Sequence, residues 1–99
     1  MSKRLDPIPP GEILLAEFMT PLGISQNRLA RDIDVPVSRI AGIIKGDRAI
    51  TADTALRLGA FFGTSAKLWL NLQTAYDLMV AEQSTWPEAK TRIRPHKAA

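Results

Sequence analysis

The chain has 99 residues, of which 45% are hydrophobic, so it can form one small domain with its own core. Its 13 Lys and Arg against 10 Asp and Glu give a formal charge of +3, which is compatible with nucleic acid but too mild to require it. The absence of cysteine excludes disulfides, thiol catalysis and thiolate metal sites. No apolar run approaches the roughly 20 residues of a membrane span, and the N-terminus lacks the apolar core of a signal peptide, so we expect a cytoplasmic protein.

Residues 1–9 are polar and proline-containing, which favours an extended N-terminal arm. A first helix is expected to begin at Pro10, because proline suits the first turn and Glu12 favours the positive end of the helix dipole. Pro21 and Gly23 should end it. We expect this helix to close over the elements that follow.

Residues 25–48 predict two short helices that meet at a sharp corner. Ser25 is a good N-cap, and the first helix must end near Asp34, because the position before Pro36 disfavours helical backbone. The second helix should stop at Gly46. Its apolar face holds Val37, Ile40 and Ile44, and its other face holds Ser38, Arg39, Gly42 and Lys45. Such a pair typifies the helix-turn-helix, whose second helix enters the major groove of DNA, although any all-α domain can contain two amphipathic helices.

Cations prevail in this segment, as the surroundings of DNA phosphates require. Residues 25–50 contain Arg28, Arg31, Arg39, Lys45 and Arg48 against Asp32, Asp34 and Asp47. The excess is modest, and a solvated helix face could show the same.

Thr51 and Ser65 should cap two further helices, the second being the longest of the chain. The first should bury Ala55, Leu58, Phe61 and Phe62, and the second should carry a core stripe of Trp69, Leu72, Tyr76, Met79 and Val80. More apolar side chains lie on the long helix than one domain can cover, which favours a homodimer. The predicted dimer interface is Leu68, Leu70, Ala75 and Leu78.

These patterns divide the chain into an arm (1–9), a helix-turn-helix domain that includes the C-terminal dimerisation helix (10–83) and a tail (84–99). The tail is basic and begins where Trp86 and Pro87 break the helical pattern. We expect it to be mobile. It could add phosphate contacts or serve only for solubility.

Six blocks of sequence point to a family. They are PGEIL (10–14), PLGISQ (21–26), RAITADTALRL (48–58), FGTS (62–65), WLNLQ (69–73) and YDL (76–78). Together they resemble the HigA/VapI antitoxins, a branch of the Cro and phage-repressor helix-turn-helix (XRE) superfamily. The resemblance implies an all-α, five-helix, lambda-repressor-like domain with a long C-terminal helix that forms a homodimer. It also implies neutralisation of a HigB/RelE-like mRNA-cleaving toxin and repression of the shared operon at a palindromic operator.

The resemblance also implies DNA-binding residues. Gln26 falls where the superfamily has a phosphate-contacting glutamine, and the other positions are Val37, Ser38 and Arg39 on the first turn of the recognition helix, Gly42 one turn later, and Lys45 and Arg48 beside the DNA backbone. Arg39 is the preferred base reader, because guanidinium can bind guanine O6 and N7 together. Ser38 could donate to a base or a phosphate. For each residue the alternative is an ordinary solvated side chain.

The chain departs from the family in two places. Asp34 stands where the turn commonly has glycine, and aspartate tolerates the left-handed conformation that the turn needs. The Pro9-Pro10-Gly11 segment replaces a common His-Pro-Gly, which leaves its role open.

An enzyme is not expected, because the one histidine, His96, lies in the tail and the carboxylates are scattered. We expect no metal, cofactor or small-molecule substrate. The main rival function is a stand-alone helix-turn-helix transcriptional regulator without a toxin partner, and a helix-bundle adaptor is another. A short, basic, RelE-like reading frame in the adjacent gene would favour the antitoxin over the stand-alone regulator. Helix one and the arm are then the surface left for the toxin.

Overall fold

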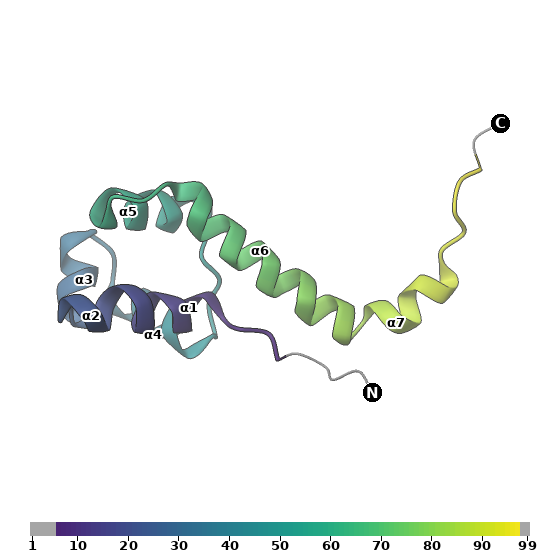
Figure 1. The fold of residues 1–99 in the computed structure, drawn as a ribbon, viewed down its shortest axis with the longest axis horizontal. Coiled ribbons are helices and arrows are strands. Elements are labelled where there is room, and N and C mark those ends of the chain that lie inside the picture. Colours follow the sequence, from purple (N-terminus) through teal and green to yellow (C-terminus); the bar gives the residue numbers. More distant parts are fainter. Residues whose placement is uncertain (1–5, 98–99) are drawn as a thin grey trace.

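The computed structural model describes residues 6–97, which form helices and connecting turns without a strand (Figure 1). The elements are α1 (Pro10–Ile13), the π-helical η1 (Leu14–Met19), α2 (Thr20–Leu22), α3 (Gln26–Asp32), α4 (Val37–Lys45), α5 (Ala52–Phe62), α6 (Ala66–Gln83), α7 (Trp86–Ala89) and the 3-10 turn η2 (Lys90–Arg92). Because α1, η1 and α2 run on without a break, the described domain up to Gln83 has the five helices that were predicted. Residues 1–5 of the predicted arm and 98–99 of the tail lie outside the described range.

The middle of helix one is π-helical, which the sequence did not predict. The Thr20 N–H donates to the Leu15 carbonyl, five residues back. Leu14 and Met19 are both buried, although residues five apart on a regular α-helix point about 140° apart. The wider π turn reduces that angle and lets both side chains reach the core. Gly23 then ends the run in the left-handed conformation, with φ of 65°.

The predicted corner is confirmed. The Ser25 hydroxyl accepts the Arg28 N–H at 3.1 Å at the start of α3. Asp34 takes the left-handed conformation with φ of 59°, and the Val35 N–H donates to the Ala30 carbonyl at 2.9 Å. Aspartate therefore does occupy the backbone position usually given to glycine. The predicted stop of α4 at Gly46 is also confirmed.

One of the expected anchors of α4 is wrong in detail. Ile40 is buried as predicted. The second buried residue of α4 is Ile43 and not the predicted Ile44, which is half-buried at the edge of the core. Ile43 is drawn in because helix one packs directly over it at Gly11, a contact that the helical spacing could not reveal.

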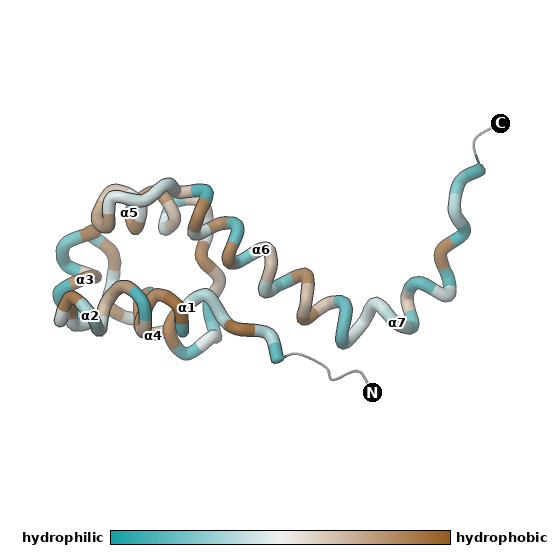
Figure 2. The backbone as a smooth tube through the Cα atoms, in the orientation of Figure 1, coloured by the Kyte–Doolittle hydropathy of each residue, from teal (hydrophilic) through white to brown (hydrophobic). Residues whose placement is uncertain are grey.

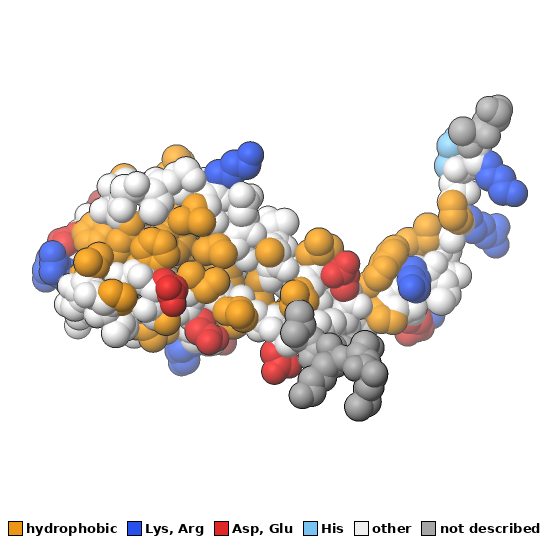
Figure 3. Space-filling view, in the orientation of Figure 1, with side chains coloured by type: hydrophobic (Ala, Val, Ile, Leu, Met, Phe, Trp, Pro, Cys, Tyr) orange, Lys and Arg blue, Asp and Glu red, His pale blue; other side chains and the backbone are white. Residues whose placement is uncertain are grey.

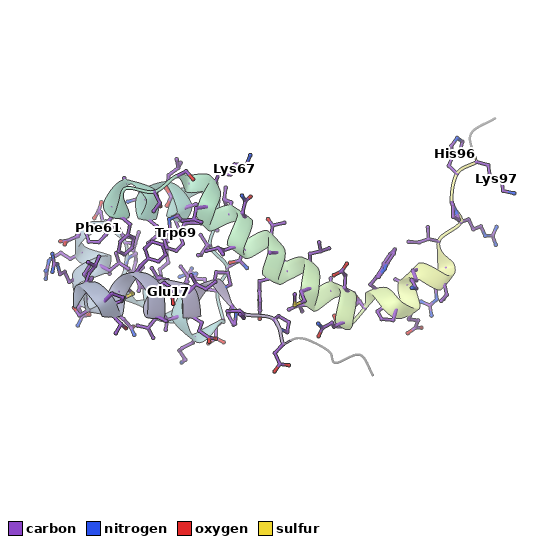
Figure 4. The ribbon with its side chains drawn as sticks, viewed as in Figure 1. Glu17, Phe61, Lys67, Trp69, His96 and Lys97 are labelled. Carbon is purple, nitrogen blue, oxygen red and sulfur yellow. The ribbon has the colours of Figure 1, made fainter. Side chains whose placement is uncertain are left out.

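Aromatic rings fill the space between helix one and α5, where Figure 3 shows hydrophobic side chains gathered on the viewed face. Ala55 and Leu58 are buried as predicted, but Phe61 and Phe62 are only half-buried. The Phe62 ring lies 5.2 Å from Phe18 and 6.0 Å from Trp69, centroid to centroid. Figure 4 shows Phe61 and Trp69 in this cluster.

The predicted core stripe on α6 is only partly correct. Trp69 is fully buried, Leu72, Tyr76 and Met79 are half-buried, and Val80 is 38% exposed. The reason is that α6 runs out of the domain (Figure 1), so its second half has no core to face. The radius of gyration is 16.9 Å, against about 13 Å for a compact domain of this length.

The tail begins with helical structure. Pro87 lies in the first turn of α7, where its missing N–H costs nothing, so the break at Trp86 and Pro87 ends one helix and starts another. The mobility of this tail stays a prediction.

Candidate nucleic-acid interface

The outward face of α4 is made by Ser38, Gly42 and Lys45, which follow one another at i, i+4 and i+7. At about 100° per residue, this line lies opposite buried Ile40. Ser38 and Lys45 are exposed and Gly42 is half-buried. A helix so anchored presents small and cationic groups to whatever lies outside it.

Val37 and Gln26 begin the two helices of the corner. Val37 was expected on the apolar face of α4 and also as a base contact; it is 44% exposed at the first turn. Gln26 is the first residue of α3 and is half-buried. Both stand at helix starts, as their predicted roles require.

Arg39 lies on the flank of α4 rather than on the Ser38 line. Its Nη1 donates to the Asp53 carboxylate at 3.3 Å, and 30% of its side chain is exposed. The guanidinium is therefore at the surface but tethered by one nitrogen to α5.

Lys45 and Arg48 differ from the other cations of this segment, since neither has an ion pair within residues 6–97. Arg28 and Arg31 each pair with Asp32, at 3.4 and 3.7 Å. The Arg48 stem covers Gly42, where an added Cβ would lie 3.2 Å from the Arg48 Cβ. Among the cations of residues 25–50, the two predicted phosphate contacts are thus the ones that pair with no carboxylate of the described residues.

The Pro9-Pro10-Gly11 segment holds α4 in place, a role that the sequence left open. Pro10 and Gly11 are buried, and a Cβ on Gly11 would lie 1.9 Å from the Ile43 carbonyl oxygen. Only glycine lets helix one approach the backbone of α4 so closely.

Gln73 supports the interface from α6 and was not recognised as such from the sequence. Its buried Oε1 accepts the Ile50 N–H at 2.7 Å, and its Nε2 donates to Asp77 at 2.9 Å. Ile50 lies in the loop after α4, so the long helix fixes the exit from the recognition helix. The WLNLQ block contained Gln73, but no local sequence pattern indicates that its hydrogen-bond partner, the Ile50 N–H, lies 23 residues away.

A second support joins α5 to the turn of the corner. Arg57 Nε donates to Asp53 at 2.9 Å, and its Nη1 donates to the carbonyls of Ile33 at 2.8 Å and Asp34 at 3.2 Å. Neither Asp53 nor Arg57 was singled out from the sequence, because the spacing of helix residues does not show which side chains cross to another helix.

The four residues predicted for a dimer interface are not equivalent. Leu68 and Leu70 are half-buried against the protein's own core, Ala75 is exposed, and Leu78 is 58% exposed. Ala75 also lines an apolar groove of about 300 Å³ between the arm and α6. Leu78 is the one large apolar side chain among these four that is exposed.

Other kinds of site find little support in the described range. Residues 6–97 contain no group of three His, Cys, Asp or Glu side chains able to hold a metal ion. None of the helices described there combines the length and apolarity of a membrane crossing. His96 follows η2, far along the chain from the corner.

The sequence and the structure both match known helix-turn-helix proteins. The profile of a helix-turn-helix family matches residues 15–69. Virulence-associated protein I of Dichelobacter nodosus is 55% identical over 76 residues, which are 77% of this chain and 70% of that protein. The structure of an addiction module antidote protein of the HigA family from Coxiella burnetii matches with a TM-score of 0.86 at 43% identity, over 93% of this chain and 100% of that one. This chain belongs to the HigA/VapI family of helix-turn-helix proteins.

Several of the similar solved structures contain DNA. The structure of the Pseudomonas aeruginosa antitoxin HigA with the higBA promoter matches with a TM-score of 0.87 at 41% identity, over 92% of this chain and 99% of that one. The resemblance inferred from the six sequence blocks is therefore confirmed, as is the fold class.

Proposed function

We propose that this protein is an antitoxin that represses its own operon by binding a palindromic operator as a homodimer and that neutralises a HigB/RelE-like, mRNA-cleaving toxin. The observation that carries the DNA-binding half is the outward line of Ser38, Gly42 and Lys45 on a helix anchored by Ile40 and Ile43. The relative solved with its promoter supports the same assignment.

Within the operator, each residue has a distinct role. Arg39 reads guanine through bidentate hydrogen bonds, Ser38 donates to a base or phosphate, and Val37 contacts a thymine methyl. Lys45, Arg48 and Gln26 bind the DNA backbone and fix the register of the protein without reading sequence. Gly42 leaves room for close approach of the helix, with the Arg48 stem beside it.

The helix that leaves the domain, α6, supports the proposed homodimer. Two recognition helices about one DNA turn apart read a palindrome, whereas a single one binds weakly. The second half of α6 offers Leu78 at 58% exposure, and Val80 at 38%. Pairing with a second copy would cover such side chains.

For the toxin we propose helix one and the arm. Helix one carries Glu12 and Glu17 and no lysine or arginine, so DNA would avoid it while a basic protein would be attracted. The arm adds Asp6 together with Lys3 and Arg4. Leu15 and Leu22 on helix one are 38% and 63% exposed and could seat in apolar pockets of that partner. Figure 4 shows Glu17 on the face where the hydrophobic side chains gather.

The DNA assignment is tested by fluorescence anisotropy on the native promoter and on a shuffled duplex over a range of salt concentrations. Arg39→Ala should reduce operator preference by about 1 to 3 kcal/mol and leave dimerisation intact. Lys45→Ala should weaken binding to both duplexes and lower the salt slope by about one unit. A wild-type protein that binds both duplexes equally would refute sequence-specific repression.

The toxin assignment is tested by co-expression with the neighbouring gene product. Glu17→Lys should weaken rescue from the toxin while operator binding is retained, because the charge change lies away from α4. Glu88→Lys on α7 is the matched control and should rescue normally. If the neighbouring product is not toxic or does not bind the wild-type protein, the chain is a stand-alone regulator.

A further inference from the structure

Asp53 lies between two arginines that come from different helices. It occupies the first turn of α5, and its Oδ2 accepts from Arg39 Nη1 at 3.3 Å and from Arg57 Nε at 2.9 Å. The positive end of the α5 dipole favours the same carboxylate. A charge held by three positive groups has a defined position, even though 58% of the Asp53 side chain is exposed.

Arg57 ties this carboxylate to the corner itself. While its Nε holds Asp53, its Nη1 donates to the carbonyls of Ile33 and Asp34. These are the residues that turn the chain between α3 and α4. The position of Asp53 is therefore set relative to the recognition helix by a direct chain of hydrogen bonds.

The tether leaves part of the Arg39 guanidinium available. The fork carries five N–H donors, of which the described residues engage Nη1 only. The edge formed by Nε and Nη2 remains available for a guanine, which needs two parallel donors. Holding Nη1 also removes rotamer freedom that an arginine otherwise loses on binding.

The carboxylate also lines the hollow beside Arg39. This hollow of about 170 Å³ lies between α4 and α5 and is lined in part by Arg39, Arg48, Thr51 and Asp53. Two arginines and a threonine alone would attract a phosphate there. The Asp53 charge repels a phosphate, and it can accept a hydrogen bond from a base amino group.

We propose that Asp53 is a specificity-determining residue of the DNA interface: it positions Arg39 for guanine and keeps phosphates out of the hollow. This inference rests on the proposed operator binding. Asp53 lowers the affinity for DNA in general and thereby increases the preference for one sequence, as a repulsive element does in other specific interfaces.

The test compares Asp53→Asn with wild type on the promoter duplex and on a shuffled duplex. The variant should bind the shuffled duplex more tightly, and its promoter preference should fall at least about fivefold. Asp47→Asn is the matched control, since it removes the same charge from the exposed loop after α4 without touching Arg39. Asp53→Glu keeps the charge and should restore part of the preference.

A double variant shows whether Asp53 acts through Arg39. In an Arg39→Ala background, Asp53→Asn should lower promoter preference no further. The proposal is overturned if Asp53→Asn keeps the wild-type preference, if Asp47→Asn loses as much, or if the losses from Arg39→Ala and Asp53→Asn simply add. A wild-type protein without promoter preference would instead refute the proposed function. Thermal unfolding checks that the variants are folded, and Asp53→Ser, which also removes the charge, gives the same comparison if Asp53→Asn is not.

Discussion

The recognition helix α4 and the second half of α6 both carry apolar side chains, yet their surroundings are opposite. Helix α4 is held at its underside by Ile40 and Ile43, near its C-terminal end by the close approach of Gly11, and at its exit by Gln73. The second half of α6 projects away from the domain (Figure 1), and hydrophobic residues recur along it (Figure 2). Intramolecular packing thus holds α4 on several sides, whereas the second half of α6 leaves apolar side chains exposed.

This difference matches the proposed function, in which α4 reads DNA and α6 joins two copies of the chain. A base-reading side chain must be positioned by its own fold before DNA arrives, because any freedom it has is lost on binding. A dimerisation helix needs only a stable first half, and the partner supplies the remainder. Four substitutions test this contrast between α4 and the second half of α6. They are given in order of expected effect, the largest first.

Gly11→Ala should break the anchoring of α4. The new Cβ would lie 1.9 Å from the Ile43 carbonyl oxygen, so helix one must shift, and we expect a loss of about 3 kcal/mol of unfolding free energy in urea. Gly23→Ala is the control, because a Cβ there meets open space and only the positive φ is strained, at a cost of about 1 kcal/mol. Equal losses would mean that the close approach is unimportant.

Leu78→Glu should expose the dependence of α6 on a partner. The side chain is 58% exposed, so the domain should stay folded while the dimer dissociation constant rises about 30-fold, roughly 2 kcal/mol, by analytical ultracentrifugation. Leu56→Glu on α5 is the matched control, as that leucine is 64% exposed and lies outside the predicted interface. A Leu78→Glu protein that dimerises like wild type would place the interface elsewhere.

Gln73→Leu should loosen the exit from α4, and it also removes the hydrogen bond from Gln73 Nε2 to Asp77 within α6. It removes the acceptor of the buried Ile50 N–H, which we expect to cost about 1 to 2 kcal/mol and to speed hydrogen exchange at that amide. Asn71→Leu, an exposed position on the same helix, should change stability by less than about 0.5 kcal/mol. Unchanged exchange at Ile50 would show that the loop is held by other contacts.

Asp34→Gly should have the smallest effect of the four substitutions and should stabilise the turn between α3 and α4. With φ of 59°, Asp34 carries backbone strain that glycine avoids, so we expect a gain of about 0.5 kcal/mol in thermal unfolding. Asp34→Ala should instead lose about 1 kcal/mol, since alanine tolerates this conformation less well. A stabilising alanine would contradict the left-handed assignment.

Local chemistry in the sequence predicted most of the helix boundaries. Ser25 and Ser65 cap their helices through the expected hydrogen bonds, and Gly46 and Gly63 end theirs with positive φ. Each signal acts within about one turn, so its outcome depends little on the remainder of the chain. These local signals did not predict the π turn of helix one. There, burial of both Leu14 and Met19, five positions apart, requires a wider helical turn.

The candidate interface was predictable in its outward residues and not in its supports. The period of α4 determines that Ser38 and Lys45 lie opposite Ile40, because helical geometry is local. Only the packing of helices decided that Arg39 meets Asp53, 14 residues on, and that Gln73 holds Ile50, 23 residues back. Such pairs depend on how whole helices cross, and the sequence by itself carries no period that records those crossings.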